Sequence, residues 1–138
     1  MYDLLSGLTV IEGSAFVAAP LGGMTLAQLG ANVLRFDPIG GGMDFKRWPL
    51  DKKGNSLYWS GLNKGKKSIT INIRKEEGRD LIKSLICAPG PENGIFLTNH
   101  PPGGPLNFDD LRSTRKDLIM LNILGSHDGT PAVDYTIN

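Results

Sequence analysis

The sequence of 138 residues contains one cysteine, Cys87, so no disulfide can form within the chain. A lone thiol fits a reducing compartment, and we therefore expect a cytoplasmic protein. Cys87 follows Leu85 and Ile86 on the apolar stripe of an expected helix. This position favours a small buried hydrophobe over a reactive thiol.

Long apolar runs are also missing, and no stretch reaches the 18 consecutive apolar residues that a membrane span requires. Asp3 and Glu12 flank the first apolar stretch and no basic segment precedes it, which argues against a signal peptide. The net charge is only +1, from 15 basic and 14 acidic residues. We therefore expect neither a nucleic acid nor a membrane as partner, and any anion site must be local.

Several motifs of known chemistry are absent. The chain has only two histidines, His100 and His127, and no His-x-x-x-His pair, so we predict no metal site. Ser14 lacks the glycine spacing of a nucleophile elbow, which disfavours a serine hydrolase. Residues 12–20 lack the three-glycine dinucleotide fingerprint, which disfavours an NAD enzyme.

What the sequence does contain is an alternation of strand and helix patterns. Short β-branched and apolar runs predict strands at residues 8–11, 32–36, 68–73, 94–98 and 118–124. Helical spacing and capping residues predict helices at 20–29, 75–87 and 107–115. Strands that alternate with helices imply right-handed crossovers, so the fold class is α/β with a mostly parallel sheet.

In such a sheet, ligands bind where the strands end. The small residues at 13–19 allow a ligand to approach the backbone, and they equally allow tight packing of a strand on a helix. Asp37 precedes a proline, which favours a turn over a contact to a ribose. The cations at 64–67 and at Arg74 fit a phosphorylated ligand as well as they fit a solvated basic loop.

Four ordered segments together resemble the N-terminal region of the class III CoA-transferases: residues 5–12, 20–37, 57–73 and 98–103. The resemblance implies a Rossmann-like large domain that binds CoA, a separate small domain, and two subunits interlocked as a homodimer. It also implies that residues 1–138 form only the first part of the large domain. We therefore expect a truncated sheet, with the remainder of the large domain and the small domain absent.

The resemblance further implies which residues contact CoA, the only cofactor expected. These lie after the first, third and fourth predicted strands: Ala15, Phe16, Val17, Ala18, Ile71, Arg74, Asn99 and His100. The sequence departs from its relatives at Pro38, where they often place an arginine against the adenine. It also has Val133 where the racemases of the family carry a catalytic histidine, which weakens a racemase assignment.

In the family, an aspartate attacks the acyl-CoA thioester and later carries CoA as a thioester of its own. No residue here matches that aspartate; Asp134 matches an acidic position near the site, or it caps a helix. Residues 12–24 and 133–136 are most similar to members that move CoA between two carboxyl groups of one branched C4-dicarboxylic unit. Transfer to a separate acid and a non-catalytic nucleotide-binding remnant stay open. We expect this chain alone to be inactive, and to be marginally stable, to self-associate, or both.

Overall fold

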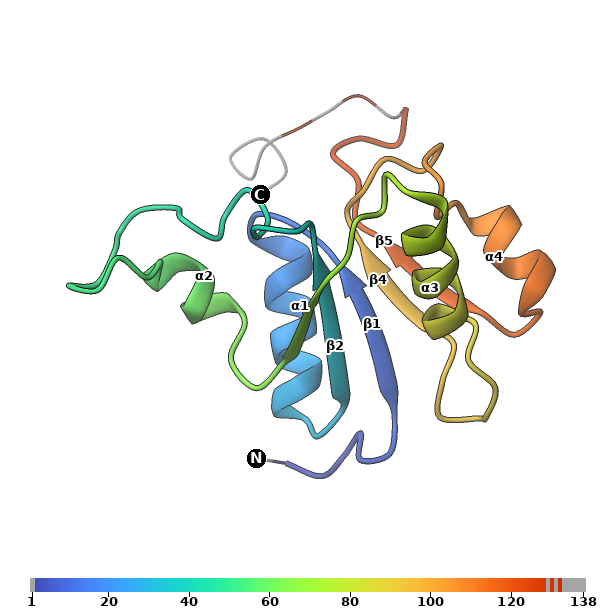
Figure 1. Cartoon of the computed structure of the whole chain (residues 1–138). Helices are drawn as coiled ribbons and strands as arrows, with labels where there is room; N and C mark the ends of the chain where they lie inside the picture. Colours follow the sequence, from blue (N-terminus) through green and yellow to red (C-terminus); the bar gives the residue numbers. More distant parts are fainter. Residues whose placement is uncertain (1, 129, 131, 133–138) are drawn as a thin grey trace.

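A computed structural model of the chain describes residues 2–128, 130 and 132 (Figure 1). Its sheet has the strand order β3-β2-β1-β4-β5, and all four neighbouring pairs are parallel. The strands are β1 Thr9–Gly13, β2 Asn32–Asp37, β3 Lys67–Thr70, β4 Ile95–Thr98 and β5 Ile119–Asn122. The predicted α/β class and parallel sheet are therefore confirmed.

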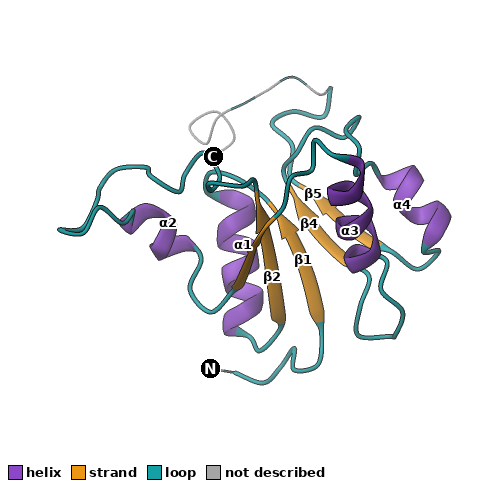
Figure 2. Ribbon diagram, viewed as in Figure 1, coloured by secondary structure: helices purple, strands orange, loops and turns teal. Residues whose placement is uncertain are grey.

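Four helices connect these strands: α1 Ala18–Gln28, α2 Leu57–Leu62, α3 Glu76–Ile86 and α4 Phe108–Thr114. The sequence predicted three of them and missed α2, which has only six residues. Ser56 begins α2 by accepting a hydrogen bond from the backbone N–H of Trp59, at 3.0 Å. Between β2 and α2, residues 38–56 run away from the sheet as a long loop (Figure 2).

Local signals explain where α3 and α4 begin. Glu76 and Glu77 lie in the first turn of α3, where the helix dipole favours negative charge. The side chain of Asn107 accepts from the backbone N–H of Asp110 at 3.0 Å and donates to the Asp110 carboxylate at 2.8 Å. Asn107 is therefore the N-cap residue of α4, and Asp110 bonds the Asn107 side chain instead of its backbone N–H as in a capping box.

The two faces of the sheet carry separate clusters of buried side chains. One packs β-strand residues such as Ile11 and Phe96 against α3 and α4; its members are Ile11, Phe36, Ile71, Ile82, Ile86, Phe96, Leu106, Leu111 and Leu118. The other packs the sheet against α1; its members are Val10, Ala19, Ala27, Ala31, Val33 and Leu97. Val10 and Ile11 enter different clusters because successive side chains of a strand point to opposite faces.

One face of the edge strand β5 is left exposed. Met120 packs against the cluster under α3 and α4, whereas Ile119 and Leu121 on the other face of the strand are 63% and 58% exposed.

Among the helices of the described residues, none combines the length and the apolar character needed to cross a membrane.

Candidate functional site

A cavity of about 310 Å³ opens at the carboxyl ends of β1, β2 and β4. This is the edge at which parallel α/β sheets bind their ligands. Its walls are mostly apolar, with a few polar groups; they comprise Ser14, Ala15, Phe16, Phe36, Asp37, Pro38, Gly42, Met43, Ile73, Asn99, His100 and Pro101. An apolar cavity with a few convergent polar groups is typical of a small-molecule site, and this volume lies at the small end of that range.

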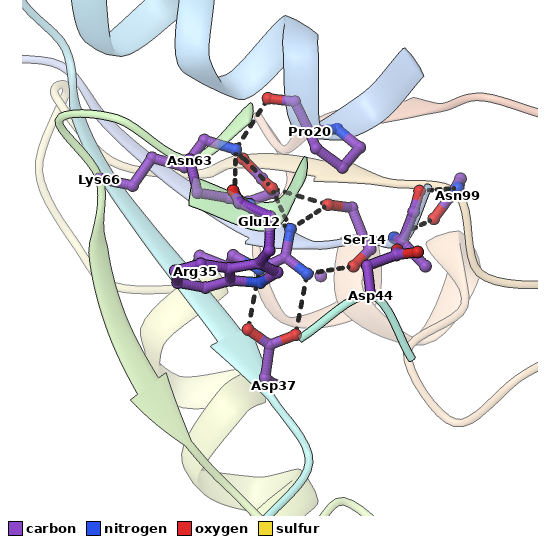
Figure 3. Close-up of polar contacts among 12 residues, drawn as sticks. Glu12, Ser14, Pro20, Arg35, Asp37, Asp44, Asn63, Lys66 and Asn99 are labelled. Atoms are coloured by element: carbon purple, nitrogen blue, oxygen red, sulfur yellow. Dashed lines mark hydrogen bonds and ion pairs between the residues drawn. The ribbon is translucent and has the colours of Figure 1, made fainter. Parts of the chain in front are cut away.

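Beside the cavity lies a buried polar network, which Figure 3 shows; its members are Glu12, Ser14, Arg35, Asp37, Asn63 and Lys66. Arg35 is at its centre and is only 1% exposed. Its guanidinium donates to both oxygens of Asp37 at 2.8 Å and to Glu12 Oε1 at 3.0 Å. It also donates to the Ser14 hydroxyl at 3.0 Å and to the Ser14 carbonyl at 2.7 Å.

Lys66, the residue immediately before β3, completes the network. Its Nζ lies 2.9 Å from Glu12 Oε1, 2.8 Å from the carbonyl of Pro20 and 2.8 Å from Asn63 Oδ1. These three acceptors occupy the three protons of the ammonium group. The sequence offered Lys66 as a phosphate ligand or as part of a solvated loop. Both readings are wrong for Lys66, since its side chain is 1% exposed and paired with Glu12.

At Arg35 and Lys66, burial and the neighbouring carboxylates shift the pKa in opposite directions. Burial alone lowers the pKa of Arg35, but the carboxylates of Asp37 and Glu12 outweigh it, and the net shift of the pKa is upward. Burial also lowers the pKa of Lys66, and here Glu12 only partly opposes the shift. Two carboxylates face two cations, so the network is formally neutral. Asp37 is thus an ion-pair partner, a role that its position before a proline did not reveal.

His100 borders the cavity beyond the end of β4. Burial lowers its pKa below 6.5, and the positive charge of Arg35 lowers it further, while Asp37 acts in the opposite direction. Its ring packs edge-on against Phe36, with 6.2 Å between the ring centres. A neutral imidazole therefore faces the cavity.

Three loops meet at the segment after β1. Asn99, from the loop after β4, accepts from the backbone N–H of Ala15 at 3.0 Å and donates to its carbonyl at 2.8 Å. Asp44, from the loop after β2, accepts from the backbone N–H of Phe16 at 2.5 Å. Phe16 has a φ of +64°, and no other described residue except glycine has a positive φ.

The structure brings half of the predicted CoA contacts together at the cavity: Ala15, Phe16, Asn99 and His100. Val17 precedes α1 and Ala18 begins it, and neither is among the residues that line the cavity. Ile71 is buried in the cluster under α3 and α4, and Arg74 is exposed beyond the end of β3. Val133 and Asp134 lie outside the described residues.

Sequence reasoning missed Arg35, Asp44 and Met43 as parts of this region. Cys87, predicted to be a buried hydrophobe, is only partly buried; its thiol packs against the cluster under α3 and α4, and burial raises its pKa. Within the described part of the chain, no group of three or more His, Cys, Asp or Glu side chains is arranged to hold a metal ion.

Comparison with known proteins identifies the family. The model of CoA-transferase family III matches residues 5–137. The chain belongs to CoA-transferase family III. The match covers nearly its whole length, so the resemblance inferred from four segments is confirmed.

Individual members of CoA-transferase family III show the same relationship. The chain is 61% identical to 2-methylfumaryl-CoA isomerase from Chloroflexus aurantiacus, across 100% of this chain and 34% of that relative. It is 36% identical to succinyl-CoA–D-citramalate CoA-transferase from the same organism, across 88% of this chain and 30% of the relative. The chain thus spans about a third of the length of these curated relatives.

A solved structure agrees with the fold of this family III chain. A CaiB/BaiF family protein from Brucella suis superposes with a TM-score of 0.85 at 30% identity, across 99% of this chain and 39% of that protein.

Proposed function

We propose that this chain forms the CoA-binding part of an enzyme that moves CoA between two carboxyl groups of one branched C4-dicarboxylic acyl unit. The reaction is of the type that converts 2-methylfumaryl-CoA to 3-methylfumaryl-CoA. The 61% identity to a relative named 2-methylfumaryl-CoA isomerase carries this proposal. The cavity supports it, because residues that the family resemblance assigns to CoA line it from two different loops.

In this proposal the cavity takes one portion of CoA, because 310 Å³ is small for the whole molecule. Ala15, Phe16, Asn99 and His100 contact that portion, and Val17 and Ala18 meet it at the start of α1. Ile71 supports the wall from within the core. Arg74 is exposed at the same edge of the sheet and supplies a cation for a phosphate.

The reacting carboxylate has no counterpart in this chain under the family resemblance. We therefore propose that the chain binds CoA but does not turn it over alone, because loss of a covalent nucleophile costs several powers of ten in rate. The complete enzyme is proposed to act as an interlocked homodimer in the cytoplasm.

Calorimetry of CoA binding tests the binding role, with Arg74→Ala compared to wild type. A charge-assisted hydrogen bond contributes about 1.5–3 kcal/mol, so we expect affinity to fall at least tenfold. Arg112→Ala is the matched control, because Arg112 is an exposed arginine of α4 that stacks on Phe108. Equal affinities in all three proteins would contradict a phosphate contact at Arg74.

A hybrid enzyme tests the reaction, with this chain replacing the corresponding third of the Chloroflexus isomerase. Turnover of 2-methylfumaryl-CoA without added free acid is expected, because donor and acceptor carboxyl groups belong to one molecule. The 36% identity to succinyl-CoA–D-citramalate CoA-transferase favours a second candidate, transfer to a separate acid. Turnover that strictly requires an added acid would select that candidate. No turnover in either condition would favour a non-catalytic nucleotide-binding role.

A further inference from the structure

Two consecutive peptide groups of the loop after β1, those of residues 14–15 and 15–16, are held by side chains from three other parts of the chain. Arg35 in β2 donates to the carbonyl of Ser14, and Asn99 bonds both the N–H and the carbonyl of Ala15. Asp44 accepts from the N–H of Phe16 at 2.5 Å. The backbone path of residues 14–16 is therefore set from outside the loop itself.

Phe16 is the member of this loop that most needs external support. Its φ of +64° is the left-handed conformation, which a side chain with a Cβ adopts at an energetic cost and keeps only when its surroundings enforce it. Asp44 is 4% exposed, so its carboxylate meets the Phe16 N–H in a water-poor setting. Its other oxygen pairs with Arg47 at 3.2 Å, and the guanidinium of Arg47 lies 5.8 Å from the centre of the Phe16 ring.

The side chain of Phe16 is part of the cavity wall, whereas Asp44 is not among the residues that line the cavity. Any effect of Asp44 on a ligand in the cavity must then pass through the residues it holds. Both N–H groups that Ala15 and Phe16 present are already bonded within the protein. The loop consequently offers a ligand the Phe16 ring and the Ala15 methyl group.

We propose that Asp44 is a positioning residue for the CoA site: by binding the Phe16 N–H it holds that residue left-handed and so fixes the ring that forms one wall of the cavity. The inference rests on the proposed function for its ligand. Asp44 directly follows Met43, a cavity-lining residue of the long loop after β2, so this loop would contribute a supporting residue as well as part of the wall. The Phe16 ring then contributes to CoA binding through its shape and position. The preorganised loop keeps the ring in that position before the ligand binds.

The test compares Asp44→Ala with Asp51→Ala in the whole 138-residue chain. Asp51 is the matched control because it lies in the same loop and also accepts backbone N–H groups, those of Lys53 and Asn55, none of which lines the cavity. Calorimetry with CoA should show an affinity loss of about tenfold for Asp44→Ala, from lost preorganisation, and less than about twofold for Asp51→Ala. Equal affinity of wild type and Asp44→Ala would overturn the proposal.

Amide hydrogen exchange of the free protein, followed by NMR, separates positioning from loss of stability. The Phe16 amide should exchange faster in Asp44→Ala, while the amide of Ile86 in α3 keeps its protection. If Asp44→Ala does not fold, Asp44→Asn takes its place, because its neutral amide oxygen accepts from the Phe16 N–H more weakly than the carboxylate does and the pairing with Arg47 is lost. Faster Phe16 exchange must then accompany a loss of CoA affinity of about threefold, again from reduced preorganisation.

Unchanged Phe16 exchange in a folded variant, or faster exchange with unchanged affinity, would overturn the positioning role. A wild-type chain that does not bind CoA would instead refute the proposed function. In that case the exchange rate of the Phe16 amide would still show whether Asp44 holds the loop, but the proposed role of Asp44 in CoA binding would be refuted.

Discussion

On the face of the sheet under α3 and α4, the buried side chains are large aliphatic and aromatic groups, among them Phe96, Ile82 and Ile86. On the face under α1, the apolar cluster is built largely from alanine and valine, and next to it four ionised side chains are buried together. The ionised face adjoins the cavity through Ser14 and Asp37. The apolar face also reaches the cavity, through Phe36, but only the ionised face places buried charges beside it.

The two faces of the sheet also differ in how closely a helix packs against them. A methyl group on Gly23 of α1 would lie 1.7 Å from Glu12 Oε2, so this helix packs directly on the buried carboxylate. At this contact there is no space for a side chain larger than glycine unless α1 or Glu12 moves. Directional bonds and close backbone approach make the ionised face less tolerant of substitution than the apolar face, where neighbouring side chains can shift.

The largest effect should come from Arg35→Met, which removes the central cation and leaves Glu12 and Asp37 with only part of their pairing. Breaking a buried ion pair in this way costs about 3–5 kcal/mol, and the free energy of unfolding in urea measures it. Arg112→Met in α4, on an exposed arginine, is the control and should change little. A cost below about 1 kcal/mol at Arg35 would show that the network contributes specificity without stability.

Two neighbouring glycines in α1 differ in how closely they approach the buried network. Gly23→Ala places its methyl against Glu12 and should lower the free energy of unfolding by about 1–3 kcal/mol, the usual cost of overpacking. Gly22→Ala meets only Leu97 at 3.7 Å, an ordinary contact. It should stabilise the helix by about 0.5–1 kcal/mol. Similar thermal midpoints for both variants would refute the close packing of α1 on the network.

The apolar face should respond more mildly. Ile86→Val removes one buried methylene from α3, where the side chain is 0% exposed, and should cost about 0.5–1.5 kcal/mol in urea unfolding. CoA affinity should stay at the wild-type value, because Ile86 lies away from the cavity lining. A marked loss of affinity would mean that the two faces are coupled.

The smallest effect concerns pH. Burial and Arg35 lower the pKa of His100 below 6.5, so below that pH the unfolded chain binds a proton that the folded chain resists. The free energy of unfolding should therefore fall as the pH drops below 6.5 and recover above it. His100→Gln should reduce this slope, whereas His127→Gln, on the exposed second histidine, should preserve it. Identical slopes in both variants would contradict the assignment.

Most of the fold could be predicted from the sequence, because parallel strands and amphipathic helices leave local patterns. The stripe containing Ile82 and Ile86 indicated α3, and Asn107 indicated the start of α4. The short helix α2 was not predicted, because fewer than two helical turns give too little periodicity in the spacing of apolar residues. Its one clear signal is Ser56, a good N-cap residue directly before it.

Much less of the site could be predicted, because its geometry depends on pairs that are distant along the chain. Arg35 stands in a strand where a charged side chain usually faces solvent, and nothing near it in the sequence indicates Glu12 or Asn63 as partners. Lys66 was equally misleading, since it belongs to a basic segment whose other cations, such as Lys64, are exposed. The family resemblance supplied the loops after β1 and β4, and the contacts that unite them came from the structure.

The central position of β1 has a consequence for how the chain folds. Its bonds to β2 join residues that are close in sequence; Glu12 and Arg35 are 23 positions apart, whereas Ala15 and Asn99 are 84 positions apart. Contacts of long sequence separation form slowly, because a large loop must close first. On a ribosome, the charged pairs around Arg35 should therefore assemble early, and the cavity should remain unfinished until β4 has emerged and docked.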